Sequence, residues 1–126
     1  MDKFINIEAE ASILGSIILN NNFLRSVEDI LEPKHFSQEI HQELYEHILK
    51  AETLVSHITL KPFFEQREQK DYLTSLLEAS SSLFTPRDYA KIVIELWKTQ
   101  LLTLGKDYLN QKIFKTRKHN LKSQTS

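Results

Sequence analysis

The sequence predicts an all-α protein: a compact bundle of about five or six helices followed by a long projecting C-terminal helix. Apolar residues recur at helical spacing along most of the chain. The 126 residues include only two glycines and three prolines, too few for the turns of many short strands. A hydrophobic content of 40% is enough for one modest core. We therefore expect a globular helical bundle over residues 1–84, a long helix over 85–115 and a basic, disordered tail over 116–126.

The first two expected helices lie before Pro33. Residues 7–19 carry a wide apolar face at helical spacing and should be mostly buried, with Asn6 as the N-cap. A short second helix over 23–31 is indicated by spaced apolar residues: Phe23, Val27, Ile30 and Leu31. Pro33 should end it, because the residue before a proline is pushed out of helical geometry. A tight corner is expected over residues 33–36.

The next expected helix follows this corner, with Ser37 as its cap. Glutamates occupy one side of it, as in an ordinary amphipathic helix. The other side is a wide apolar stripe: Ile40, Leu44, Tyr45, Ile48 and Leu49. Beyond this helix, residues 54–58 are too short to classify by periodicity and are compatible with an extended segment.

Two short helices are expected before residue 82. Thr59 should cap the first, which carries two phenylalanines and tolerates Pro62 in its first turn. After a polar connector over 65–70, Asp71 should start the second, which the serines at 80–82 end. Its apolar residues lie on one side: Tyr72, Leu73, Leu76 and Leu77.

The last expected helix is the longest. Thr85 is placed to cap it, with Pro86 at the first helical position and Asp88 three residues after the cap. If the helix runs to about Phe114, its length at 1.5 Å per residue is roughly 45 Å, more than the diameter of the bundle before it. Part of this helix should therefore project from the bundle.

One apolar stripe continues along this helix at steps of four and three residues, the spacing of a helix-packing seam. It consists of Ala90, Ile94, Trp97, Leu101, Leu104 and Tyr108. Leaving them in water would forgo about 1.5–3 kcal/mol for each large side chain. We expect self-association here; the alternative is that the tail folds back over the seam. Gly105 could bend the helix or permit close approach.

Charge is distributed unevenly although the net charge is −1. Residues 1–95 carry 9 basic and 16 acidic side chains, whereas residues 96–126 carry 7 basic and 1 acidic. The basic tail contains Lys112, Lys115, Arg117, Lys118 and Lys122. Such a tail can attract nucleic acid or an acidic partner. We favour a solvated terminus, because Phe114 is the only aromatic residue among these cations on which a base could stack.

Catalytic, cofactor and metal sites are not expected. The chain lacks cysteine and the glycine-lysine loop that cradles nucleotide phosphates. Its five histidines do not converge as metal ligands, and the serines at 80–82 lack the turn of a catalytic serine. We therefore expect a protein that is not an enzyme. Without a signal peptide or an apolar run of about 18 residues, it should be soluble and cytosolic.

Several segments resemble, in order and spacing, the N-terminal domain of DnaB-type bacterial replicative DNA helicases. The opening segment 7–19 is similar to that family's first helix. The corner 31–36, with His41 and Tyr45 after it, resembles its proline-phenylalanine corner and third helix. The segments Tyr72–Leu76 and Tyr89–Val93 occupy the places of its later helices. Two departures are a shorter loop before Tyr72 and the expected absence of the motor domain that follows in the family.

The resemblance implies an interaction domain, not a motor. Family membership would mean self-association into a collar of paired subunits and docking of primase and other replication proteins in the bacterial cytoplasm. ATP-driven unwinding would belong to the parent helicase, and DNA contact by this chain would be weak or absent. Two alternatives stay open: a stand-alone adaptor or inhibitor that binds a helicase, and a nucleic-acid binder that acts through the basic tail.

Overall fold

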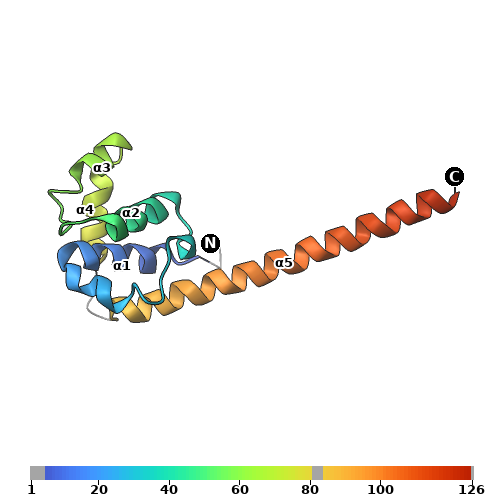
Figure 1. Ribbon diagram of the computed structural model, residues 1–126, viewed down its shortest axis with the longest axis horizontal. Helices are drawn as coiled ribbons and strands as arrows, with labels where there is room; N and C mark the ends of the chain where they lie inside the picture. Colours follow the sequence, from blue (N-terminus) through green and yellow to red (C-terminus); the bar gives the residue numbers. More distant parts are fainter. Residues whose placement is uncertain (1–4, 81–83, 126) are drawn as a thin grey trace.

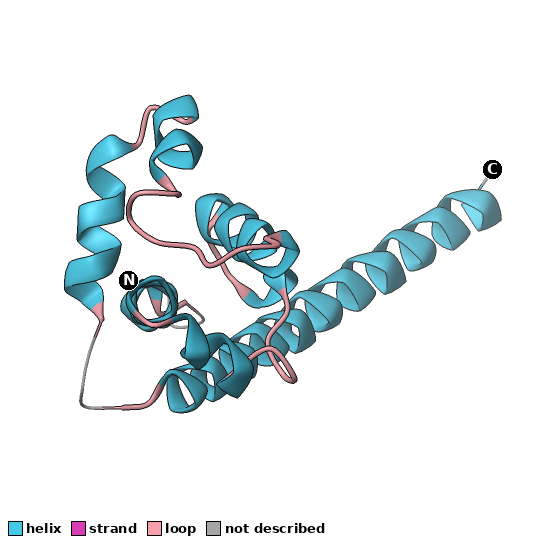
Figure 2. Cartoon of the chain, turned by 60° about the vertical axis from the view of Figure 1, so that its left-hand side comes forward, coloured by secondary structure: helices cyan, strands magenta, loops and turns pink. Residues whose placement is uncertain are grey.

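Every regular element that the structure describes is helical, and Figure 2 shows these helices joined by loops. The computed structural model describes residues 5–80 and 84–125, with side chains as far as Gly105. The elements, with 3-10 helices labelled η, are α1 (Ile7–Leu19), η1 (Asn21–Ser26), η2 (Pro33–His35), α2 (Glu39–Lys50), α3 (Lys61–Gln66), α4 (Lys70–Ala79) and α5 (Pro86–Thr125). The predicted all-α fold, with a bundle and a long projecting last helix, is confirmed (Figure 1).

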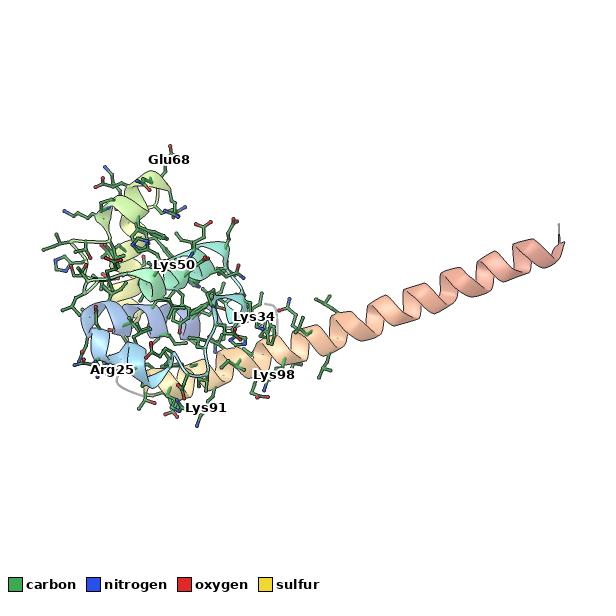
Figure 3. All side chains as sticks on the ribbon, in the orientation of Figure 1. Arg25, Lys34, Lys50, Glu68, Lys91 and Lys98 are labelled. Carbon is green, nitrogen blue, oxygen red and sulfur yellow. The ribbon has the colours of Figure 1, made fainter. Side chains whose placement is uncertain are left out.

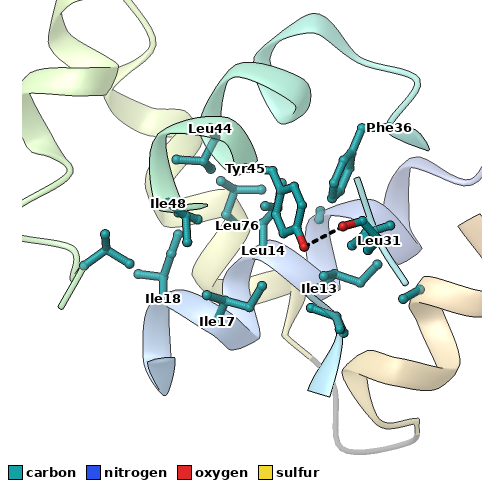
Figure 4. Packing of buried hydrophobic residues seen from close by; sticks show 14 of the residues in the cluster. Ile13, Leu14, Ile17, Ile18, Leu31, Phe36, Leu44, Tyr45, Ile48 and Leu76 are labelled. Atoms are coloured by element: carbon teal, nitrogen blue, oxygen red, sulfur yellow. Dashed lines mark hydrogen bonds between the residues drawn. The ribbon is translucent and has the colours of Figure 1, made fainter. Parts of the chain in front are cut away.

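Helix α1 lies at the centre of the bundle. The Asn6 side chain accepts a hydrogen bond from the backbone N–H of Ala9 at 3.0 Å, which confirms the predicted N-cap. The helix packs against α4 and α5 and also contacts α2. Its residues Ile13, Leu14 and Ile17 are fully buried in the hydrophobic core (Figure 4). The predicted burial of this helix is therefore confirmed.

The corner at η2 delivers Phe36 into the same core. The Phe36 and Tyr45 rings lie 5.2 Å apart between centroids. The Tyr45 hydroxyl donates a hydrogen bond to the carbonyl of Leu31 at 2.9 Å (Figure 4). Burial raises the pKa of Tyr45, so the hydroxyl keeps the proton that it donates. The corner is thereby tied to α2 through both an aromatic contact and a buried hydrogen bond.

The short second helix predicted over residues 23–31 is present but differs in type and extent, since it spans only Asn21–Ser26. The chain forms the 3-10 helix η1 and then turns. The Asn20 side chain accepts from the N–H of Asn22 at 3.1 Å, and the Ser26 hydroxyl donates to the carbonyl of Phe23 at 2.7 Å. Short polar side chains thus bond to local backbone groups. Backbone bonds of α-helical span follow only after η1, from the N–H of Glu28 to Leu24 and from the N–H of Leu31 to Val27, each at 2.8 Å. The four apolar residues on which the prediction rests are compatible both with an α-helix and with a 3-10 helix followed by a turn.

Two predicted helix caps are also wrong. Gln38 stands at the N-cap of α2, while the Ser37 hydroxyl donates to Glu10 at 2.6 Å. Leu60 stands at the N-cap of α3, while the Thr59 hydroxyl accepts from the N–H of Ser56 at 2.8 Å in the preceding turn. In both cases the side chain that the sequence pattern predicts as the cap is hydrogen-bonded to another group: Ser37 to Glu10, and Thr59 to Ser56.

The segment 54–58, which the sequence leaves unclassified, is irregular. Asn21 holds it through a pair of hydrogen bonds to Val55. The Asn21 amide donates to the Val55 carbonyl at 2.9 Å, and its oxygen accepts from the Val55 N–H at 2.7 Å. This pair of bonds fastens the loop between α2 and α3 to the first residue of η1.

Helix α5 begins at the predicted place. The Thr85 hydroxyl accepts from the N–H of Asp88 at 3.2 Å, and the Asp88 carboxylate lies 3.4 Å from the N–H of Thr85. This reciprocal arrangement is a capping box. The helix then continues to Thr125, past residue 115, where the sequence predicts the disordered tail to follow. Figure 1 shows its C-terminal part extending away from the bundle.

A buried polar network links α1, α2 and α4. The Glu10 carboxylate lies 2.8 Å from Nδ1 of His41, and Nε2 of His41 lies 2.6 Å from the Tyr72 hydroxyl. Glu10 also accepts from the N–H of Ser37 at 3.1 Å. Because a carboxylate only accepts, Nδ1 of His41 carries the proton in this arrangement. The network fixes three helices relative to one another at a place where the apolar core offers no directional contact.

Candidate interaction surface

The expected seam on α5 is divided between the core and the surface. Ala90 and Ile94 are buried within this chain, where they join the hydrophobic core. This corrects their assignment to a self-association surface, because α5 uses its first turns to cover α1. Leu101 is 48% exposed and Leu104 is 56% exposed. The available part of the seam therefore begins where α5 leaves the bundle.

Trp97 marks this transition. It is half-buried, and the ring of His35 lies edge-on against it with 4.6 Å between centroids. Nζ of Lys34 lies 5.1 Å from the centroid of the indole, a cation–π distance. The corner at η2 therefore holds the tryptophan in place against the side of α5. Figure 3 labels Lys34 and Lys98 close to this junction.

A groove of about 250 Å³ opens beside Trp97. The helix α5 supplies one wall, and the N-terminal segment, the η2 corner and α2 supply the rest. Its lining residues are Ile5, Lys34, Phe36, Ser37, Gln42, Trp97, Gln100, Leu101 and Leu104. The exposed leucines of α5, Leu101 and Leu104, line this groove. The groove and the exposed face of α5 therefore form one surface with apolar and polar side chains.

Two parts of the sequence prediction lie outside the described side chains. Tyr108, the last residue of the expected seam, belongs to the described helix, but its side chain does not belong to the described set. The same holds for the tail cations: Lys112, Lys115, Arg117, Lys118 and Lys122. Their roles stay predictions. Gly105 is described, and a Cβ placed on it would meet nothing within 4 Å among the described residues, apart from the neighbouring turns of its own helix.

The walls of the groove outside α5 were not foreseen from the sequence. Ile5, Phe36 and Gln42 are far from Trp97 in the chain and have no pattern in common with it. Only the corner at residues 33–36 has a sequence signal, because Pro33 favours a turn there. A further contact without a sequence signal joins Glu43 to Nε of Arg67 at 2.7 Å, 24 residues further along the chain.

His35 beside Trp97 is expected to make stability depend on pH. Its Nδ1 accepts from the backbone N–H of Glu32 at 2.9 Å, which requires the neutral ring. Burial lowers the pKa of His35 below its ordinary value of 6.5; the Glu32 carboxylate opposes this shift, and Lys34 and Lys98 reinforce it. The unfolded chain therefore takes up the proton first. The contribution of His35 is complete above pH 6.5 and is lost as the pH falls below it toward the folded-state pKa.

Urea unfolding followed through the fluorescence of the single tryptophan measures this dependence. The free energy of unfolding should fall between about pH 7.5 and about pH 5.5. His35→Asn keeps an acceptor near the Nδ1 position without a titrating ring, so its curve should be flatter over that range. Equal slopes for the two proteins would show that His35 does not carry the effect.

Neither a metal site nor a membrane span emerges from the described part of the chain. Within it, no group of three or more potential ligands could hold a metal ion. None of its helices is long and apolar enough to cross a membrane. The fold and the surface thus define an all-α domain with a projecting helix that carries an exposed apolar face.

Comparisons with known proteins agree with this class. A model of the DnaB-like helicase N-terminal domain matches residues 2–95. The replicative DNA helicase DnaB of Rickettsia typhi is 36% identical over 115 residues, and that of Rickettsia conorii is 34% identical. Each alignment covers 83% of this chain and 23% of the relative. The chain belongs to the DnaB-like helicase N-terminal domain family.

A solved structure supports the fold independently. The crystal structure of the N-terminal domain of DnaB helicase from Mycobacterium tuberculosis superposes with a TM-score of 0.78 at 20% sequence identity. The match covers 90% of this chain and 87% of that one. The chain spans about a quarter of the length of the curated relatives. The matched region is the N-terminal domain of these replicative helicases.

Proposed function

We propose that this chain is an interaction domain of bacterial DNA replication that self-associates through the exposed part of α5. It would act in the cytoplasm as the collar of a replicative helicase, and primase and other replication proteins would dock on it. ATP-driven unwinding would be supplied by a motor with a P-loop, which these 126 residues do not contain. Membership of the family supports this assignment.

One observation carries the proposal: the apolar stripe of α5 continues beyond the bundle. Trp97 is half-buried, whereas Leu101 and Leu104 are largely exposed on the next turns. A groove next to Trp97 can receive side chains from a second copy. Covering such leucines with an apolar partner contributes about 1.5–3 kcal/mol each. Pairing of α5 with another helix is therefore the most direct way to remove this surface from water.

Substituting aspartate for the exposed leucines tests this proposal. Leu101→Asp and Leu104→Asp should each weaken self-association about tenfold or more, because each removes an apolar contact and places a charge in the interface. Light scattering on a size-exclusion column across a concentration range measures the molar mass. Circular dichroism should show that the helical content is retained, because both positions lie on the exposed surface.

Leu102→Asp is the matched control. Leu102 is 69% exposed on the same helix, but it lies about 160° around the helix axis from Leu104. It should therefore leave the association constant within about twofold. If Leu102→Asp weakens association as much as the other two, or if the unsubstituted chain is a monomer at every concentration, the seam is not the interface. Primase docking is then tested separately by co-elution of the chain with the cognate primase.

A further inference from the structure

A second groove lies between α3 and α4, at the end of the bundle away from the projecting helix (Figure 1). Its volume is about 390 Å³. Phe64, Leu73 and Leu77 form an apolar floor, and Phe64 and Leu73 also belong to the hydrophobic core. The rim is polar, and it includes His57, Lys61, Glu65, Lys70 and Thr74. The groove is therefore an apolar trough with charged edges.

The charge at this rim differs from that of the rest of the bundle. Residues 1–95 carry 9 basic and 16 acidic side chains, yet the rim holds two lysines and a histidine against a single glutamate. Among the described side chains, five basic residues outside the groove form ion pairs within 4.0 Å: Lys34, Lys50, Arg67, Arg87 and Lys98. Lys61 and Lys70 form no ion pair with any side chain that the structure describes. Their charges are available to a ligand.

The helices on either side of the groove are held in a fixed geometry. The guanidinium of Arg67 lies 3.7 Å above the ring of Phe63 and binds the Glu43 carboxylate at 2.7 Å, which fastens the end of α3 to α2. The N–H of Gln69 donates to the carbonyl of Phe64 at 2.8 Å. Glu68 adopts a positive φ of 56°, which closes the tight turn between α3 and α4. The groove is thus formed before any ligand binds.

We propose that this groove binds an acidic amphipathic helix of a partner protein. The trough between two packed helices accepts the ridge of a third, in the way that helix surfaces interdigitate. Apolar side chains on one face of the ligand would lie on Phe64, Leu73 and Leu77. Carboxylates on either side of that face would meet Lys61 and Lys70.

This surface goes beyond self-association through α5, and the two proposals fail independently. A partner bound here would leave the exposed leucines of α5 free, because the groove lies at the other end of the bundle (Figure 1). The domain could then contact another copy with α5 and a separate protein with α3 and α4. The second partner is recognised by its chemistry: an acidic helix with a leucine-rich face.

A pair of synthetic peptides tests the proposal on the full chain. The first is an alanine-based helix of about four turns with leucines on one face and glutamates beside them. The second has the same leucines, with lysine in place of every glutamate. The acidic peptide should shift the backbone amide resonances of α3 and α4 in nuclear magnetic resonance spectra and should bind at least about tenfold more tightly than the basic one.

Reversing the charge of the two rim lysines tests whether they select the acidic peptide. The double variant Lys61→Glu and Lys70→Glu should weaken binding of the acidic peptide about tenfold and should favour the basic peptide. Arg25→Glu with Lys91→Glu also reverses two exposed cations that take no part in the ion pairs of the described residues, at the edge of the bundle away from α3 (Figure 3). This control should bind within about twofold of the unsubstituted chain. Circular dichroism checks that both variants are folded.

Four outcomes would overturn the proposal. Equal binding of the two peptides would remove the role of the lysines, and resonance shifts confined to α5 would place the acidic helix elsewhere. An altered molar mass of the Lys61→Glu and Lys70→Glu variant in light scattering would show that a second copy of the chain covers the groove. Absence of binding by the acidic peptide would also reject it, while leaving self-association through α5 unaffected.

Discussion

Gly15→Ala should destabilise the bundle more than any other substitution that adds one methyl group. A Cβ built on Gly15 would overlap the carbonyl oxygen of Leu76 and lie 2.9 Å from its carbonyl carbon. Both atoms belong to the backbone of α4, so no side-chain rotation relieves the clash. We expect a loss of at least about 3 kcal/mol in the free energy of unfolding, measured by urea denaturation followed through tryptophan fluorescence.

Gly105→Ala is the control within the same chain. Within the part of the chain that the structure describes, a Cβ at Gly105 would meet nothing within 4 Å outside its own helix, α5. Alanine has the higher helix propensity, so this variant should be unchanged or more stable by up to about 1 kcal/mol. Comparing the two variants distinguishes Gly15, which close helix packing requires, from Gly105, which the helix only tolerates. Equal stabilities of the two variants would show that α1 and α4 do not approach as the structure describes.

The sequence predicts those elements whose signals are local. The helix starts at Asn6 and Thr85 are specified by side chains within three residues of the groups that they cap, and both occur where expected. The close approach at Gly15 has no such signal, because it depends on the path of α4, about 60 residues further along the chain. Ser37 fits a cap equally well by sequence, but Glu10 offers it a stronger, charged acceptor.

In the candidate interaction surface, too, the sequence predicts the local features and not those that depend on distant parts of the chain. Helical spacing places Trp97 and Leu101 on one stripe, and the structure keeps that order along α5. Helical spacing does not distinguish the part of the stripe that packs in the chain's own core from the part that is exposed. It therefore predicts Ala90 and Ile94 as interface residues, although both are buried. That distinction depends on where the bundle ends, which only the packing of α1 against α5 determines.

Glu10→Ala should have the second large effect on stability, because it removes the acceptor at the centre of the buried polar network. The His41 ring, the Ser37 N–H and the Ser37 hydroxyl all bond to this carboxylate, at 2.8, 3.1 and 2.6 Å. Each would lose its partner at a site where Glu10 and His41 are buried. Leaving a buried polar group without its partner costs about 1–3 kcal/mol for each group, since the remaining groups stay desolvated.

Tyr72→Phe removes only the outer member of the network. Burial, with the Glu10 carboxylate as a second cause, raises the pKa of Tyr72, so its hydroxyl remains protonated and donates to Nε2 of His41. Loss of this one hydrogen bond should cost about 1 kcal/mol. The expected order of destabilisation is therefore Glu10→Ala first and Tyr72→Phe well below it, measured by urea unfolding at neutral pH.

Glu8→Ala controls for the general loss of a carboxylate from the first turn of α1. Glu8 is exposed, so its substitution removes only a favourable interaction with the helix dipole, worth less than about 1 kcal/mol. If Glu10→Ala costs no more than Glu8→Ala, the network does not hold the helices together. A large difference between two glutamates that lie two residues apart would instead show that the network, and not helix α1 itself, fixes α2 and α4 around the core.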